Sequence, residues 1–200
     1  KDIVEVGCGS GFFLKLLCEL GGNRGRGFDP AIAQQKTDVC GAGQVTLIPD
    51  CYNEAQSDLP CDLLVSRSMF ELIHNPMEFL HALRRTIGDR SDTRVYLDIP
   101  NSNYVFQKRA LWNLFYEQCN YFVERSLSDA FRRAGFDVLK SGECLGDGYY
   151  LYVEAAPSEP AQQGNANGAE LSVPIELVAL AEELQLQRRQ WKSRFSRWQA

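Results

Sequence analysis

Three glycines between two acidic residues carry the clearest chemistry in this sequence. The glycines, Gly7, Gly9 and Gly11, directly follow a short apolar run at residues 3–6. A helical pattern of apolar residues then begins at Phe12. Glycine lets the backbone adopt positive φ and lets a ligand approach without striking a Cβ atom, and the N–H groups that open a helix face the same space. The spacing by itself fits a dinucleotide site, a nucleoside site or only a tight turn.

The two acidic residues, Glu5 and Asp29, narrow this choice. Glu5 interrupts the apolar run, where an ionised carboxylate is costly unless it binds something. Asp29 ends the next predicted strand, about twenty residues further on, where a carboxylate can accept both hydroxyls of a ribose. Asp29 also suits the N-cap of a helix beginning at Pro30. The NAD pattern GxGxxG is not matched cleanly, because Phe12 occupies the position of its third glycine.

The stretch from Ile3 to Gly11 resembles motif I of the class I S-adenosylmethionine (SAM) methyltransferases, in which an acidic residue precedes three alternating glycines. The resemblance implies SAM as cofactor. At Asp50, an adenine contact and a simple turn aspartate are equally open interpretations. The residues expected to hold SAM are Glu5, Gly7, Cys8, Gly9, Gly11, Asp29, Pro30, Asp50, Cys51, Ser66 and Arg67.

Strand and helix patterns alternate along the chain, which predicts an α/β fold with a Rossmann-like, doubly wound, mostly parallel sheet. We expect seven strands, near residues 3–6, 25–28, 44–48, 61–66, 93–99, 136–139 and 149–155, the last two forming an antiparallel edge. A short helix is expected from Pro30 to about Val39, and Ser126 is expected to be the N-cap of a helix that ends at Ala134. In such a sheet, ligands bind beyond the carboxyl ends of the strands.

A second motif begins at the end of the fourth predicted strand. It resembles a methyltransferase pattern, Arg-His-x-(Leu/Phe)-Glu-His-x-x-(Asn/Asp)-Pro, that leads into a helix. Ser68 and Leu72 replace the two histidines of that pattern. The matching residues are Arg67, Phe70, Glu71, Asn75 and Pro76.

The aromatic segment 101–122 and the residues after it resemble the C-methyltransferases of nucleotide-linked keto-deoxysugars, and the similarity extends from about Asp2 to Ala156. The resemblance implies a general base and a neighbouring tyrosine that together form an enolate of the sugar. By position, the candidates for catalysis are Glu117, Tyr116, Gln118 and Tyr121. Gln118 replaces the histidine of the family and cannot take up a proton at neutral pH. Packing is the alternative role for the two tyrosines.

The expected function is therefore SAM-dependent methylation of a small polar metabolite, with a keto-sugar nucleotide methylated at carbon as the specific acceptor. Two alternatives remain open. One is transfer to oxygen or nitrogen of another small molecule, for which positioning of the acceptor is sufficient. The other is a non-catalytic SAM-binding module of a larger protein, which the replaced histidines would suit.

Composition restricts the partners of the chain. A net charge of -5 argues against nucleic acid as the main partner. The sequence shows neither a membrane span nor a signal peptide, so a cytoplasmic location is expected. The seven cysteines form no CxxC pair, so no metal site is expected.

Three regions are expected along the chain. Residues 1–156 form the methyltransferase domain, and residues 157–174 are a linker rich in Pro, Gly and Asn. Residues 175–200 form an amphipathic helix with apolar residues at near-heptad spacing. We expect this helix to pack against a second copy of the chain or against a further domain.

Overall fold

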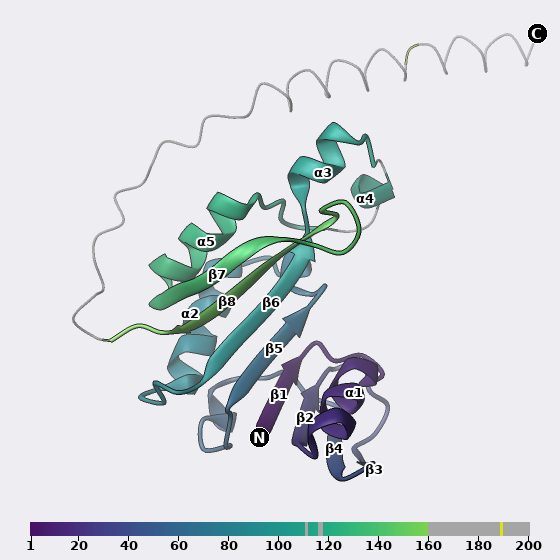
Figure 1. Ribbon diagram of the computed structural model, residues 1–200, viewed down its shortest axis with the longest axis vertical. Helices are drawn as coiled ribbons and strands as arrows, with labels where there is room; N and C mark the ends of the chain where they lie inside the picture. Colours follow the sequence, from purple (N-terminus) through teal and green to yellow (C-terminus); the bar gives the residue numbers. More distant parts are fainter. Residues whose placement is uncertain (111, 116–117, 160–188, 190–200) are drawn as a thin grey trace, which may run out of the picture.

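The computed structural model describes residues 1–110, 112–115, 118–159 and 189, and this part of the chain is built on one sheet of eight strands (Figure 1). The order across the sheet is β3-β4-β2-β1-β5-β6-β8-β7. The strands are β1 (Asp2–Val6), β2 (Arg24–Phe28), β3 (Lys36–Cys40), β4 (Gly43–Ile48), β5 (Leu63–Arg67), β6 (Arg94–Pro100), β7 (Phe136–Cys144) and β8 (Tyr150–Pro157). The α-helices are α1 (Phe12–Gly21), α2 (Pro76–Ile87), α3 (Ser102–Gln107), α4 (Trp112–Phe115) and α5 (Glu124–Arg133).

The five strands in the middle of the sheet, from β4 to β6, are parallel to one another. β8 pairs antiparallel with β6, and β7 pairs antiparallel with β8. From β1 the chain winds outwards through β2 to β4 and then returns to the other side of β1 to form β5. This reversal is the switch point at which doubly wound sheets bind ligands. The expected Rossmann-like α/β fold with an antiparallel edge is confirmed.

The described sheet has one strand more than the seven expected, and the additional strand is β3. The helix predicted up to Val39 was wrong, because this segment pairs antiparallel with β4. Gly41 adopts a φ of 59°, which lets the chain turn sharply between the two strands. Asp38 forms ion pairs at 2.9 Å with Lys36 and with Lys15 of α1. The tight turn and these contacts favour a hairpin over a free helix.

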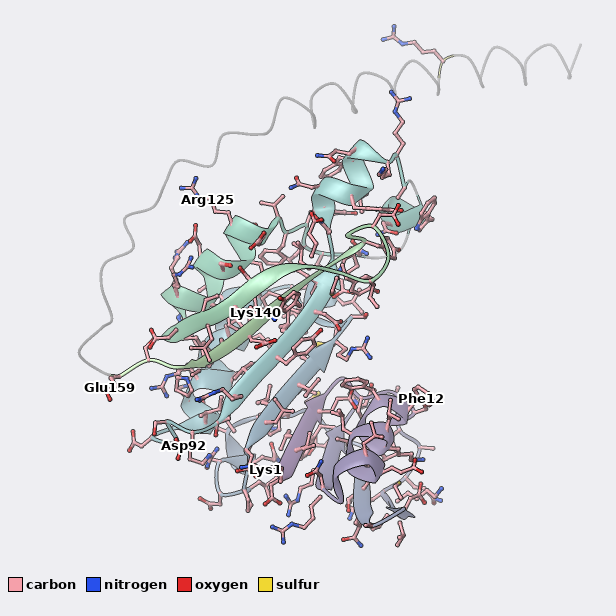
Figure 2. All side chains as sticks on the ribbon, viewed as in Figure 1. Lys1, Phe12, Asp92, Arg125, Lys140 and Glu159 are labelled. Carbon is pink, nitrogen blue, oxygen red and sulfur yellow. The ribbon has the colours of Figure 1, made fainter. Side chains whose placement is uncertain are left out.

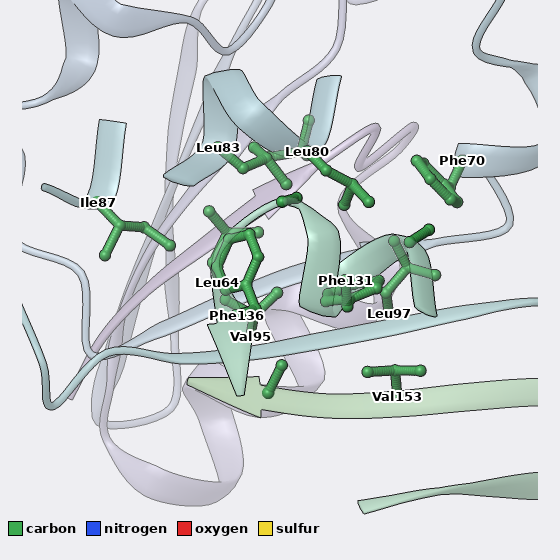
Figure 3. Close-up of a cluster of buried hydrophobic side chains, with 14 of the residues drawn as sticks. Leu64, Phe70, Leu80, Leu83, Ile87, Val95, Leu97, Phe131, Phe136 and Val153 are labelled. Carbon is green, nitrogen blue, oxygen red and sulfur yellow. The ribbon is translucent and has the colours of Figure 1, made fainter. Parts of the chain in front are cut away.

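Helices cover the two faces of the sheet unequally (Figure 1). α2 and α5 lie on one face, where they enclose the larger hydrophobic cluster together with β5, β6 and β8 (Figure 3). Leu64, Leu97 and Phe131 of this cluster are fully buried. α1 lies on the other face over β1, β2 and β4, and Leu14 and Val45 belong to its smaller cluster. The two clusters hold the helices on the sheet and so determine the position of the edge at which the parallel strands end.

The start of α5 corrects the role expected for Ser126. Val123 is the N-cap of this helix, and Ser126 occupies its third position. The Oγ atom of Ser126 accepts the N–H of Val123 at 3.0 Å, which is the return half of a capping box. Serine is common at N-caps, but its hydroxyl also satisfies an unpaired N–H from inside the first turn. Gly135 follows the helix with a φ of 86°, as expected for a left-handed end.

Candidate active site

The glycine turn links the carboxyl end of β1 to α1, and all three glycines adopt positive φ. A Cβ atom on Gly7 would come within 2.7 Å of the Met69 side chain, and one on Gly11 within 2.5 Å of Leu47. A Cβ on Gly9 would meet nothing within 4 Å, although its φ is 52°. The outer glycines are therefore required by packing inside the protein. The middle glycine faces open space, which is the position a ligand would approach.

The turn is fastened to the end of β2. The N–H of Gly7 donates to the carbonyl of Phe28 at 2.8 Å. Asp29 accepts the N–H of Gly9 on one carboxylate oxygen at 2.9 Å and the N–H of Ala31 on the other at 2.8 Å. Asp29 thus lies beside the middle glycine, where the sequence placed a ribose-binding carboxylate. The helix that it was expected to cap is absent from this described stretch, since Asp29 and the exposed Pro30 form a turn instead.

Asp50 and Cys51 follow β4, the strand next to β2, and both are exposed. Asp50 accepts the N–H of Cys51 at 2.7 Å, so its side chain is folded back on the turn. Cys8 is buried, and its sulfur fills the space over Gly27, where an added Cβ would lie 2.6 Å from it. The side chain of Cys8 therefore packs against β2 at Gly27 and supports the glycine turn from inside the protein.

Glu5 lies on β1 with only 3% of its surface exposed, and its Oε2 atom has no hydrogen-bond partner. Burial raises the pKa of its carboxyl to about 7, and the nearby Arg67 opposes this shift. Arg67, at the end of β5, donates from Nε to Oδ2 of Asp98 at 2.7 Å. The guanidinium of Arg67 also lies 4.3 Å from the centre of the Phe13 ring. Ser66 is buried, and its hydroxyl has no partner.

Two carboxyl groups of the site were not among the expected site residues, although one of them, Glu71, belongs to the second motif. Asp98 on β6 is 2% exposed and Glu71, in the short 3-10 helix after β5, is 5% exposed. Each keeps one oxygen atom without a partner. Burial raises the pKa of Glu71 to about 7, and the charge of Asp98 adds to the shift. The signal for Asp98 was available, because it is an acidic residue inside an apolar strand, as Glu5 is.

The backbone of Glu71 connects the end of β5 to the aromatic segment. Its carbonyl accepts the N–H groups of Cys119 and Asn120 at 2.8 and 3.0 Å. The side-chain amide of Asn120 donates to the carbonyl of Ile73. Gln118, the residue before this contact, is half-buried. The end of the aromatic segment is therefore anchored to the turn after β5 through Cys119 and Asn120.

Of the four residues proposed for catalysis, Tyr116 and Glu117 lie outside the part of the chain that the structure describes. Tyr121 is 41% exposed, and its ring lies 6.2 Å from that of Phe106. The hydroxyl of Tyr121 donates to the carbonyl of Asn113 at 3.5 Å. Partial burial raises the pKa of Tyr121. Tyr121 is thus held at the rim of the segment by contacts within the segment itself.

An aromatic wall stands beside this rim, formed by Tyr104, Tyr149 and Tyr150. The Tyr149 ring lies edge-on to both others, with ring centres 5.1 Å from Tyr104 and 5.2 Å from Tyr150. Trp112 donates from its indole nitrogen to the Tyr149 hydroxyl at 3.2 Å. The Ser68 hydroxyl donates to the Tyr150 hydroxyl at 3.0 Å. Through these contacts the wall connects helices α3 and α4 to the turn after β5.

The structure also places several other aromatic and histidine residues. Phe122 is a packing residue, which stacks on Phe70 with ring centres 5.2 Å apart. His81 is exposed on α2, and His74 lies in a loop with its Nδ1 atom 3.7 Å from the sulfur of Cys119. Phe12, which replaces the third glycine of the NAD pattern, projects from α1 with 77% of its surface exposed (Figure 2).

The described residues include neither a candidate membrane-spanning helix nor a candidate metal cluster. No helix among them is long and apolar enough to cross a bilayer. Within the same residues, no group of three or more His, Cys, Asp or Glu side chains is arranged to hold a metal ion.

Residues 1–141 match the family model described as a methyltransferase domain, so the chain belongs to this family. No curated protein matches the sequence significantly. S-adenosylmethionine is the cofactor that this membership supports. The glycine turn, with Asp29 beside it and open space over Gly9, fits that cofactor.

Solved structures share the fold at low sequence identity. One is a complex between the Haloferax volcanii Trm112 methyltransferase activator and a methyltransferase, at 17% identity and a TM-score of 0.59, covering 79% of this chain and 83% of that one. Another is the N,N-8-amino-8-demethyl-D-riboflavin dimethyltransferase RosA from Streptomyces davawensis, at 18% identity and a TM-score of 0.58. The match covers 79% of this chain and 50% of RosA. The LepI complex with SAM matches at 11% identity and a TM-score of 0.58, covering 78% of this chain and 42% of LepI. This chain thus spans about half the length of RosA and less of LepI.

Proposed function

We propose that this chain transfers the methyl group of SAM to a small polar acceptor held between the end of β5 and the aromatic segment 101–122. The observation that carries the proposal is the glycine turn, which is fastened by Asp29 and open over Gly9 at the switch point of a parallel sheet. SAM would be held by the turn and by Asp29, with Asp50 and Cys51 at the end of the neighbouring strand.

SAM supplies an electrophilic methyl group, and the residues of this chain have to bind, orient and shield it. Positioning the acceptor in line with the sulfonium carbon accounts for much of the rate of such a reaction. With an acceptor bound, the aromatic wall and the 118–121 stretch, which is bonded to Glu71, would cover its outer side. Methylation of small molecules by RosA is consistent with this proposal, but at 18% identity it supports only the fold.

The nature of the methylated atom follows from the available bases. Carbon methylation of a keto-sugar nucleotide requires removal of a proton from carbon before transfer. Gln118 replaces the histidine of the C-methyltransferases that this sequence resembles, and it cannot act as a base at neutral pH. An oxygen or nitrogen acceptor needs only a group that accepts its proton as the bond to the methyl forms. The buried carboxyls of Glu71 and Asp98 favour this second acceptor type.

Calorimetric titration with SAM and with its product, S-adenosylhomocysteine (SAH), tests the cofactor assignment. We expect both to bind, and NADH not to bind. Tight binding of NADH without binding of SAM would overturn the proposal.

A solvent-exchange experiment separates the two acceptor types. The chain is incubated in D₂O with a keto-sugar nucleotide, and deuterium is measured at the carbon beside the ketone. Exchange that disappears in Glu117→Gln would support carbon methylation. Methyl transfer to a hydroxyl or amine without any such exchange would support the heteroatom acceptor. SAM binding without turnover on either substrate type would instead indicate a non-catalytic module.

A further inference from the structure

Glu71 lies just after β5, the strand beside β1, and its carbonyl accepts two N–H groups from the end of the aromatic segment. The charge of Asp98, which is paired with Arg67, acts on Glu71. The charge of Glu71 acts in turn on Tyr150. The charges of both Arg67 and Asp98 act on the carboxyl of Glu5, which lies on the strand that leads to the glycine turn. These ionisable groups therefore influence one another electrostatically, from β1 to the aromatic wall.

The carboxyl of Glu71 is more than nine-tenths buried, and its Oε2 atom has no partner within the protein. A buried polar atom without a hydrogen bond destabilises the fold unless a ligand supplies the missing partner. The backbone around Glu71 satisfies itself through Cys119 and Asn120, so these contacts do not need the side chain. The side chain itself accepts the N–H of Glu71, which leaves only Oε2 without a partner. Ser68 and Tyr150 hydrogen-bond to each other.

We propose that Glu71 is the acceptor-side catalytic residue, which accepts the hydrogen bond and then the proton of a hydroxyl or amine carried on a planar ring. This inference rests on the proposed methyltransferase function and names the class of substrate for the same site. The ring would lie against the aromatic wall, where edge-on and stacked contacts favour flat, apolar faces. The donor group would complete the hydrogen bonding of Oε2.

The electrostatics of the junction favour a hydrogen-bond donor over a nucleotide-linked substrate. Three carboxyls are buried here, on Glu5, Glu71 and Asp98, and the cation among them, Arg67, is already paired with Asp98. A diphosphate next to these carboxylates would be repelled, whereas a hydroxyl or amine proton would be attracted. The distribution of charge thus separates the two substrate classes discussed above.

The proposed step is balanced as follows. An oxygen lone pair of the acceptor attacks the methyl carbon of SAM, and the carbon–sulfur bond breaks with its electron pair remaining on sulfur. The neutral thioether SAH is formed. The O–H bond of the acceptor breaks, and its proton moves to Oε2 of Glu71, from which it is released to solvent after the product leaves. An amine acceptor loses its N–H proton along the same route.

Binding of 4-nitrophenol to the SAH-loaded chain tests this assignment without knowledge of the natural acceptor. The matched ligand is 4-nitroanisole, which has the same ring but no hydrogen-bond donor. We expect the phenol to bind the wild-type protein at least ~10-fold more tightly, because a hydrogen bond to a charged group is typically worth that much. In Glu71→Gln this preference should be largely lost, while SAH affinity remains unchanged.

Glu78→Gln is the matched control, because Glu78 is exposed at the start of α2 and bonds only to Asn75 among the contacts described. It should retain the full preference for the phenol. Equal binding of the two ligands to wild type, or a preference that persists in Glu71→Gln, overturns the assignment of Glu71 and leaves the methyltransferase proposal intact. A wild-type chain that does not bind SAH overturns the methyltransferase proposal itself. The comparison of ligands on wild type requires no variant to fold.

Discussion

Replacing the middle glycine of the turn separates ligand binding from folding more cleanly than any other change in the site. In Gly9→Ala the new methyl group meets no protein atom within 4 Å, so the cost to the fold comes from the backbone alone. An alanine held at a φ of 52° should destabilise the fold by about 1–2 kcal/mol. The same methyl group projects into the space assigned to SAM, so affinity should fall by at least ~10-fold, as expected for a steric clash in a packed site.

Two further glycines calibrate this result. Gly146 in the turn between β7 and β8 has a φ of 59° and also faces open space, so Gly146→Ala should show the same loss of stability with normal SAH binding. Gly11→Ala adds a contact at 2.5 Å with Leu47 to the backbone cost, and overpacking should bring its total to roughly 2–5 kcal/mol.

Urea unfolding measures the stability of these variants, and calorimetric titration with SAH measures their affinity. The reasoning would be refuted if Gly9→Ala bound SAH as tightly as wild type, because the open space over this residue would then not hold the ligand. Equal losses of affinity in the Gly9→Ala and Gly146→Ala variants would also refute it, since a general loss of stability would then explain both.

Three further predictions concern charge and packing. The folded-state pKa of Glu5 is raised from 4.5 to about 7, so the native state binds this proton more tightly and the free energy of unfolding should fall as pH rises between these values. Glu5→Gln should flatten this slope in urea unfolding measured from pH 4 to 8, and an unchanged slope would exclude Glu5 as its source. Arg67→Ala leaves Asp98 buried without its cation and should lower the free energy of unfolding by ~3–5 kcal/mol. The double variant with Asp98→Asn should recover part of this stability. Additive losses in the two single variants would contradict the pairing. Leu64→Ala removes a fully buried side chain from the larger cluster and should cost ~2–5 kcal/mol, with normal SAH affinity per folded molecule as the check that the site is intact.

The fold could be predicted well where the pattern is local. The runs around Val4 and Leu64 are short, apolar and bounded by glycine or proline, which is typical of buried parallel strands. The prediction failed at β3, because Lys36–Cys40 has a mixed polar pattern and becomes a strand only by pairing with β4. Such pairing depends on tertiary contacts that a single segment does not display.

The candidate site could likewise be predicted only where its residues form a local pattern. The glycine turn could be recognised because its residues are neighbours in sequence, and Asp29 because it ends the next strand. Asp98 was missed although it is an acidic residue inside an apolar strand, and Glu71 was recognised only as part of the second motif. The burial of the two carboxyls, and the effect of the Asp98 charge on Glu71, become visible only in the folded chain. Asp29 was also expected to cap a helix. In the structure its two carboxylate oxygens instead accept the N–H groups of Gly9 and of Ala31 in the following turn. Roles that depend on what surrounds a side chain require coordinates.

The hydrogen bond from Gly9 to Asp29 has a kinetic consequence. It holds the turn in shape while the site contains no ligand, so the loss of backbone entropy is already incurred during folding. A ligand arriving at a loop that is already arranged does not wait for a rare conformation, and its association rate is set by diffusion and orientation. Differences in affinity among nucleoside ligands of this site should therefore appear mainly in how quickly each one leaves.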